Sequence, residues 1–163
     1  MIKEVTGDIL LTKAQCTAHG IAVNDDFKVG LALSIRERWP ALYKDFRHFC
    51  HTKSPTPGEV FAWGGSEHTV IYNLLTQNPP LGHGDHPHKA QLTHVGHCLK
   101  NLKKILEKEN FKSLAMPKIA TGVGGLDWND VYPMIKETLG EISQKMDIYI
   151  YTTYKKGVAA NED

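Results

Sequence analysis

Apolar positions along the chain repeat with two different periods, which predict helices and strands in alternation. The clearest helical pattern lies at Leu92, Val95, Leu99, Leu102 and Leu106, whose spacings of 3, 4, 3 and 4 residues place them on one helix face. Short runs rich in apolar, β-branched or aromatic residues predict strands instead. The expected strands span residues 2–5, 14–23, 58–63, 68–75, 113–120 and 147–154, and the expected helices span 29–38, 41–51, 89–108 and 129–140.

Turn-forming residues separate these elements. Gly64 and Gly65 predict a hairpin between two neighbouring strands, and the Pro, Gly and His residues of 77–88 predict a loop. Residues 155–163 are expected to form a frayed tail. Because strands and helices interleave, most clearly in the second half of the chain, the pattern indicates an α/β domain with a mainly parallel sheet.

Length and charge narrow the class of protein. A chain of 163 residues suggests one domain, and 19 Lys and Arg against 18 Asp and Glu predict no strong attraction to nucleic acids or anionic membranes. The apolar runs are too short to span a bilayer, and the charged first residues do not form a signal peptide. Three widely spaced cysteines (Cys16, Cys50 and Cys98) predict reduced thiols. We therefore expect a cytoplasmic monomer.

Two glycine-bearing loops each lead from an expected strand into an expected helix. They are NDDFKVG at 24–30 and TGVGGL at 121–126, and ligands of parallel sheets bind beyond the carboxyl ends of the strands. Glycine lets the backbone approach phosphate, and free N–H groups at a helix start favour anions. Neither loop matches G-x-x-x-x-G-K-[ST] or G-x-G-x-x-G. The loops favour a diphosphate ligand over an ATPase or dehydrogenase, although TGVGG is also consistent with a simple helix-entry turn.

Four stretches, in this order and spacing, resemble the macro domain family. They are GDIL at 7–10, AHGIA…FKVGLALSIRERWP within 18–40, PGEV at 57–60 and PKIATGVGGLDW at 117–128. Within the family, the chain looks most similar to terminal ADP-ribose glycohydrolases and to the macro-domain antitoxins of DNA ADP-ribosylation systems. The resemblance implies a three-layer α/β/α sandwich with a central mixed, mainly parallel sheet over residues 1–155, followed by a tail at 156–163.

The resemblance also implies a site for ADP-ribose, with no cofactor. Asp8 would accept a hydrogen bond from the adenine amino group, the Ile9 N–H would add a contact, and Tyr151 would flank the adenine. Capping of a turn by Asp8 and ordinary strand packing of Tyr151 remain alternatives. The diphosphate loops would comprise Lys28, Val29, Gly30 and Leu31, and then Thr121, Gly122, Val123, Gly124, Gly125 and Leu126.

The sequence departs from these relatives at the positions that carry their catalysis. Gln77 stands where glycohydrolase relatives have a lysine, and Gly124 stands where the terminal glycohydrolase has an aspartate, so the lysine–aspartate mechanism is unsupported. His19, Asp25 and His83 are the remaining candidate acids or bases near the distal ribose.

The histidine-rich loop is also a candidate metal site. His83, His86, His88 and Asp85 are zinc-type ligands, but their spacing matches no known metal motif, so we expect no metal. The favoured function is hydrolysis of an ADP-ribosyl linkage or of ADP-ribose 1''-phosphate. The alternatives are a non-catalytic reader of ADP-ribose or ADP-ribosylated partners, and a protein whose degenerate cleft makes protein contacts.

Overall fold

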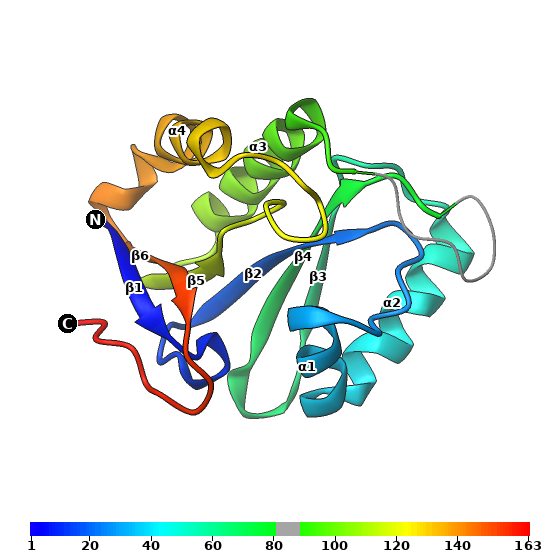
Figure 1. Ribbon diagram of the computed structural model, residues 1–163, viewed down its shortest axis with the longest axis horizontal. Helices are drawn as coiled ribbons and strands as arrows, with labels where there is room; N and C mark the ends of the chain where they lie inside the picture. Colours follow the sequence, from blue (N-terminus) through cyan, green and yellow to red (C-terminus); the bar gives the residue numbers. More distant parts are fainter. Residues whose placement is uncertain (81–88) are drawn as a thin grey trace.

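A central sheet lies between two helical layers in the computed structural model, which describes residues 1–80 and 89–163 (Figure 1). The strands are β1 (Ile2–Gly7), β2 (Cys16–Ala22), β3 (Val60–Gly64), β4 (Val70–Gln77), β5 (Ser113–Pro117) and β6 (Asp147–Tyr154). The helices are α1 (Gly30–Arg38), α2 (Pro40–Lys53), α3 (Leu92–Lys108) and α4 (Trp128–Leu139), with short 3-10 turns η1 (Ile9–Leu11), η2 (Ser66–His68) and η3 (Ile142–Gln144).

The strand order is β1-β6-β5-β2-β4-β3, and within this sheet β3 alone runs antiparallel to its neighbour. Pairing of Gly64 with Val70 closes the β3–β4 hairpin that the two glycines predicted. The parallel pairs arise because helices or long connections return the chain to the amino edge of the sheet. The predicted mixed, mainly parallel sheet and three-layer sandwich are therefore confirmed.

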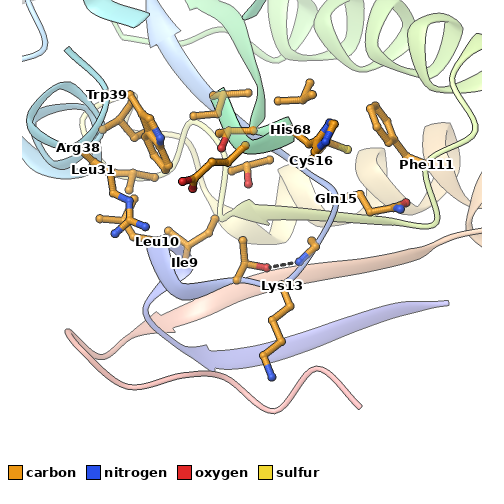
Figure 2. Close-up of a pocket in the computed structure, with 18 residues that line it drawn as sticks. Ile9, Leu10, Lys13, Gln15, Cys16, Leu31, Arg38, Trp39, His68 and Phe111 are labelled. Carbon is orange, nitrogen blue, oxygen red and sulfur yellow. Dashed lines mark hydrogen bonds between the residues drawn. The ribbon is translucent and has the colours of Figure 1, made fainter. Parts of the chain in front are cut away.

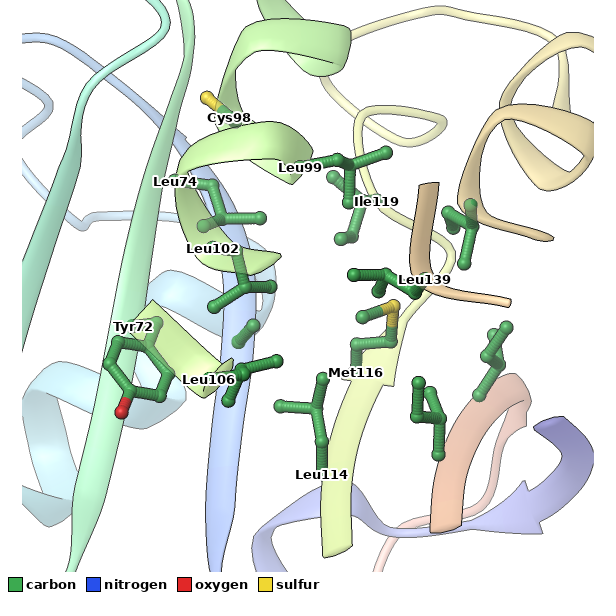
Figure 3. Packing of buried hydrophobic residues seen from close by; sticks show 14 of the residues in the cluster. Tyr72, Leu74, Cys98, Leu99, Leu102, Leu106, Leu114, Met116, Ile119 and Leu139 are labelled. Carbon is green, nitrogen blue, oxygen red and sulfur yellow. The ribbon is translucent and has the colours of Figure 1, made fainter. Parts of the chain in front are cut away.

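Helices α3 and α4 cover one face of the sheet and bury the larger core cluster. The predicted α3 stripe is correct: Val95, Leu99 and Leu102 are 0% exposed. Figure 3 shows leucines of α3 beside Leu74 of β4 and Met116 of β5. Complete burial of one such side chain stabilises the fold by about 1.5–3 kcal/mol, so this stripe fixes α3 on the sheet.

Helices α1 and α2 cover β2, β4 and β3 on the other face, where Phe27 and Phe46 are fully buried. The remaining part of that face carries Val5, Tyr149 and Tyr151, which pack with Ile9 of η1. Instead of a helix, η1, the connection to β2 and residues 155–163 cover these side chains, with Ala160 packed against them.

Residues 155–163, here called the C-terminal segment, are attached to the domain along β1. The Asp8 N–H donates to the Val158 carbonyl at 2.7 Å, and the Lys155 N–H donates to the Gly7 carbonyl at 3.0 Å. The predicted frayed tail is therefore wrong, because these backbone groups find partners in β1 and just after it. No helix of the described residues has the length and apolar content needed to cross a membrane.

Candidate functional site

The parallel strands bring their carboxyl ends, and the segments that follow them, to one edge of the sheet. Asp8 follows β1, residues 23–29 (the first loop) follow β2, and residues 118–127 (the second loop) follow β5. This edge thus gathers both glycine-bearing segments, as expected for the ligand edge of a parallel sheet.

The first loop is anchored by one aromatic side chain. Phe27 is 0% exposed and contacts the rings of His19, Tyr43 and Phe46, with centroids 5.2–5.9 Å apart. Its positive φ of 55° is a conformation that non-glycine residues seldom adopt, and the burial of the ring holds it there. Deep anchoring at Phe27 leaves the next residues, 28–30, exposed at the sheet edge.

Carboxylates of the first loop stabilise its own turns. Asp25 accepts the Phe27 N–H at 2.8 Å, and Asp26 accepts the Lys28 N–H at 3.2 Å. The Lys28 ammonium lies 3.9 Å from the Asp26 carboxylate and is largely exposed. Burial raises the pKa of Asp25, and the nearby Asp26 charge adds to the rise while the bond from Phe27 opposes it. Burial therefore favours the neutral form of the Asp25 carboxyl.

The start of α1 is open to an anion. Val29 precedes the helix without a side-chain cap, so the first N–H groups of α1 have no side-chain acceptor among the described residues. Gly30 has a φ of 61°, and a Cβ there would meet no atom within 4 Å. Open space over uncapped N–H groups is the arrangement that binds phosphate at a helix start.

The second loop presents a short run of unpaired backbone donors. The N–H groups of Gly122, Val123 and Gly124 donate to no atom of the described residues. A Cβ on Gly122 would meet nothing within 4 Å, and Val123 is 62% exposed. Consecutive free N–H groups form an anion-binding concavity. In contrast to α1, helix α4 is already capped, because Asp127 accepts the Asn129 N–H at 2.8 Å.

Gly124 is also needed for the shape of the second loop. A Cβ on it would lie 2.6 Å from the carbonyl oxygen of Ala120, whose own φ is 63°. The missing side chain of Gly124 is therefore required by the turn of the second loop itself. Gly122 is the glycine of this loop above which space is open.

The proposed adenine residues are largely buried. Asp8 is 6% exposed, and its carboxylate accepts the Leu10 N–H at 3.0 Å and the Gly157 N–H at 2.9 Å. Asp8 thus caps η1, the alternative noted from the sequence, and it also holds the C-terminal segment. The Ile9 side chain is buried directly after it. Tyr151 is 6% exposed, donates to Glu162 at 2.7 Å, and has its pKa raised, chiefly by burial.

The catalytic candidates do not form one group in the described residues. The His19 ring is 2% exposed, and its Nε2 lies 2.6 Å from Asn73 Oδ1 on the neighbouring strand. Burial lowers the pKa of His19 to about 4, which keeps the ring neutral at neutral pH. Gln77 is also buried, at the end of β4. His83 lies outside the described residues.

Lys89 lies beside the second loop and is a candidate site residue that the sequence analysis did not name. Its side-chain carbons lie 3.5–3.7 Å from the position of a Cβ on Gly125, and the adjacent Ala90 N–H donates to the Gly124 carbonyl at 2.9 Å. A cation is thus placed beside the second loop by a contact between segments more than thirty residues apart. The sequence offered one signal for it, a lysine at the first position of a predicted helix.

A separate cavity of about 560 Å³ lies at the amino ends of β2 and β4, beneath α1 (Figure 2). Figure 2 shows Trp39 and Leu31 at one end and Phe111 at the other. Of the predicted ligand-binding residues, Ile9 and Leu31 line it. The glycines of both loops stand outside this lining, so the cavity is distinct from the carboxyl edge. In the described residues, no three His, Cys, Asp or Glu side chains cluster closely enough to hold a metal ion.

Comparison with known proteins gives matches along most of the chain. A model of the Macro domain family matches residues 22–135. A DNA ADP-ribosyl glycohydrolase of Mycobacterium tuberculosis is 24% identical over 156 residues, which is 93% of this chain and 42% of that protein. The chain therefore spans less than half of that relative. An ADP-ribose 1''-phosphate phosphatase of Candida albicans is 21% identical over 145 residues, covering 84% of this chain and 93% of that protein.

Solved structures with the same fold are similar over most of this chain. The macrodomain of Thermus aquaticus DarG has a TM-score of 0.81 and 22% identity, covering 93% of this chain and 98% of that one. Thermosipho africanus DarTG in complex with ADP-ribose has a TM-score of 0.79 and 21% identity, covering 91% of this chain and 41% of that one. At these identities the structural likeness is evidence for the fold alone.

Proposed function

Because this chain belongs to the macro domain family, we propose that it binds ADP-ribose at the carboxyl edge of its sheet, with the diphosphate between the first and second loops. The observation that carries the proposal is the set of backbone N–H groups without acceptors at the start of α1 and at 122–124. A diphosphate satisfies such groups and is favoured by the positive end of the α1 dipole. The ADP-ribose complex of the similar Thermosipho protein supports this choice of ligand.

Residues on either side of the loops would hold the rest of the ligand. Asp8 would accept from the adenine amino group, with the Ile9 N–H beside it and Tyr151 flanking the ring. Lys28 and Lys89 would supply positive charge to the diphosphate from the first and second loops, since both are exposed at this edge. The carboxylate of Asp8 thus suits the adenine at one end of the ligand, and the two lysines suit the diphosphate at the other.

Hydrolysis of an ADP-ribosyl linkage is the second candidate function, and Asp25 is the observation that favours it. Its raised pKa suits a carboxyl that takes a proton from water as water attacks the anomeric carbon. The carbon–oxygen bond to the leaving group breaks, and the proton ends on that leaving oxygen. For ADP-ribose 1''-phosphate, water would attack phosphorus instead. The glycohydrolase and phosphatase relatives support this class of reaction.

A melting experiment tests the binding proposal. A ligand that binds the folded state alone stabilises it by about 2.7 kcal/mol at a concentration one hundred times its Kd. We expect ADP-ribose to raise the melting temperature, and we expect adenosine, which lacks the diphosphate, to raise it much less. Equal shifts with both ligands, or none with either, would contradict a diphosphate site.

Turnover separates the two candidate functions. ADP-ribosylated protein, ADP-ribosylated DNA and ADP-ribose 1''-phosphate are incubated with the protein, and released ADP-ribose or phosphate is measured against a blank without protein. Release that is lost in an Asp25→Asn variant would support hydrolysis. Binding without release would leave the reader function.

A further inference from the structure

The C-terminal segment lies across the adenine end of the proposed site. The Gly157 N–H donates to Asp8 Oδ2, and the Val158 carbonyl accepts the Asp8 N–H. Both polar groups of Asp8 that face this segment are therefore paired with it. Since Asp8 is only 6% exposed, a ligand reaches its carboxylate only if part of this cover moves.

Gly7 allows this close approach. A Cβ on Gly7 would lie 2.8 Å from both the Ala160 nitrogen and the Val158 carbonyl oxygen, distances that a real side chain does not tolerate. The absence of a side chain at Gly7 thus allows the C-terminal segment to pack directly against the backbone. The sequence resemblance explained the same residue only as part of an opening motif.

Glu162 fastens the far end of the segment. Its carboxylate accepts the Tyr151 hydroxyl at 2.7 Å and the Lys13 N–H at 2.9 Å, and it also accepts the Thr12 hydroxyl. Bonds to a charged acceptor are stronger than bonds between neutral groups, so this anchor holds the segment down. Tyr151, the aromatic residue assigned to the adenine, is thereby tied to the same segment.

We propose that residues 157–162 form a strap over the adenine end of the site, and that adenine binding at Asp8 competes with the seating of this strap. The inference rests on the proposed ADP-ribose function and concerns its regulation. Release of Gly157 exposes Asp8 Oδ2 for the adenine amino group, which replaces one N–H donor by another. The apparent affinity for ADP-ribose is then lowered by the fraction of molecules in which the strap is closed.

Two variants of the full chain loosen the strap without replacing any of the proposed ligand-binding residues. Glu162→Ala removes the anchor. Gly157→Ala keeps the N–H that bonds Asp8 and meets no atom within 4 Å, but it places a side chain at a φ of 74°. Asp163→Ala is the matched control, because it removes a neighbouring negative charge whose side-chain carboxylate bonds to none of the described residues.

ADP-ribose affinity is measured by calorimetry for the wild type and the three variants. Loss of a charge-assisted anchor shifts the closed-to-open ratio by about tenfold, so we expect Glu162→Ala to bind ADP-ribose up to about tenfold more tightly. Gly157→Ala should change in the same direction and Asp163→Ala should bind like the wild type. Unchanged or weaker binding by both strap variants would overturn the proposal.

Amide hydrogen exchange measures directly whether ADP-ribose displaces the strap. A segment that only covers the sheet would show no faster exchange when the ligand binds. ADP-ribose should speed exchange at the Gly157 amide if the strap is displaced, and slower exchange there would overturn the proposal. If no variant binds ADP-ribose, the proposed function fails and the competition fails with it. If all bind with equal affinity, the function stands and the strap proposal alone falls.

Discussion

Burial decides the protonation state of His19. From the sequence, this residue was a candidate either for catalysis or for packing in the core. The ring is enclosed between Asn73 of the adjacent strand and the edge of Phe27, so its charged form is poorly solvated. In the unfolded chain the same imidazole titrates near its ordinary pKa of 6.5. Only the unfolded state therefore takes up a proton as the pH falls from about 6.5 toward 4.

The resulting pH dependence has a definite sign. Because the folded-state pKa is lowered, the contribution of neutral His19 to the free energy of unfolding is fully present above pH 6.5. This contribution is lost as the pH falls toward 4. We expect the free energy of unfolding of the wild type to drop by up to about 3 kcal/mol more over this range than that of a His19→Gln variant. Denaturant unfolding at several pH values measures it.

The control for this comparison is His48→Gln, since His48 is an exposed histidine on α2. It should follow the wild-type pH dependence. Identical pH slopes for wild type and His19→Gln would mean that His19 is as readily protonated in the folded protein as in the unfolded chain.

Asp8 shows why a residue's type can be predicted when its partners cannot. A carboxylate after the first strand is visible in the sequence, and so is its suitability for an adenine amino group. Its bond to Gly157 joins residues far apart in the chain, and no spacing in the sequence indicates it. The burial of Asp8 and the strap that covers it therefore required the structure.

At the scale of elements, the second loop uses its glycines for different purposes. Gly122 lies under open space, so a side chain there extends to where the ligand is proposed to bind. Gly124 lies against the Ala120 carbonyl, so any side chain there strains the turn. Within the described residues both glycines have free N–H groups to offer the proposed binding surface, but only Gly124 is also required by the construction of the loop.

Substitutions at these two positions should separate binding from stability. We expect Gly122→Glu to abolish ADP-ribose binding, because a negative side chain would occupy the space proposed for the negative diphosphate. The melting temperature should stay near that of the wild type, because the new side chain meets no protein atom at its Cβ. We expect Gly124→Ala to destabilise the fold by about 1–3 kcal/mol, the usual cost of forcing a side chain into a filled space. Thermal melting and calorimetry of both variants measure the two effects.

Either of two results would contradict this assignment. Retained ADP-ribose binding by Gly122→Glu would mean that the second loop is only a helix-entry turn. A stable Gly124→Ala variant would mean that the loop adjusts without cost, and that the close approach to Ala120 does not explain the glycine.

Element types were predictable, but several boundaries were not. Period and composition identified α3 and β6 because their patterns are long and regular. The strand expected at 113–120 ends at Pro117, and the last three of these residues belong to the second loop, where Ala120 takes up a positive φ. A local backbone conformation of this kind depends on contacts with Gly124 that sequence spacing does not encode.

At the scale of the whole molecule, alternation of strands and helices was sufficient to predict the mainly parallel sheet, and the family resemblance implied the three layers. It was not sufficient to predict how the face of β1, β5 and β6 is covered, because residues 155–163 carry little apolar content and no periodic pattern. Their attachment comes from hydrogen bonds to β1 and to Asp8. The same attachment places a segment from the end of this chain over the proposed ligand edge.

Calorimetric titration with ADP-ribose, ADP and AMP tests the central claim most directly. If the two loops bind the diphosphate and the edge beyond them reads the distal ribose, affinity should weaken from ADP-ribose to ADP and again to AMP. Binding of AMP as strong as that of ADP-ribose, or no binding of any of the three, would contradict a diphosphate site between the first and second loops.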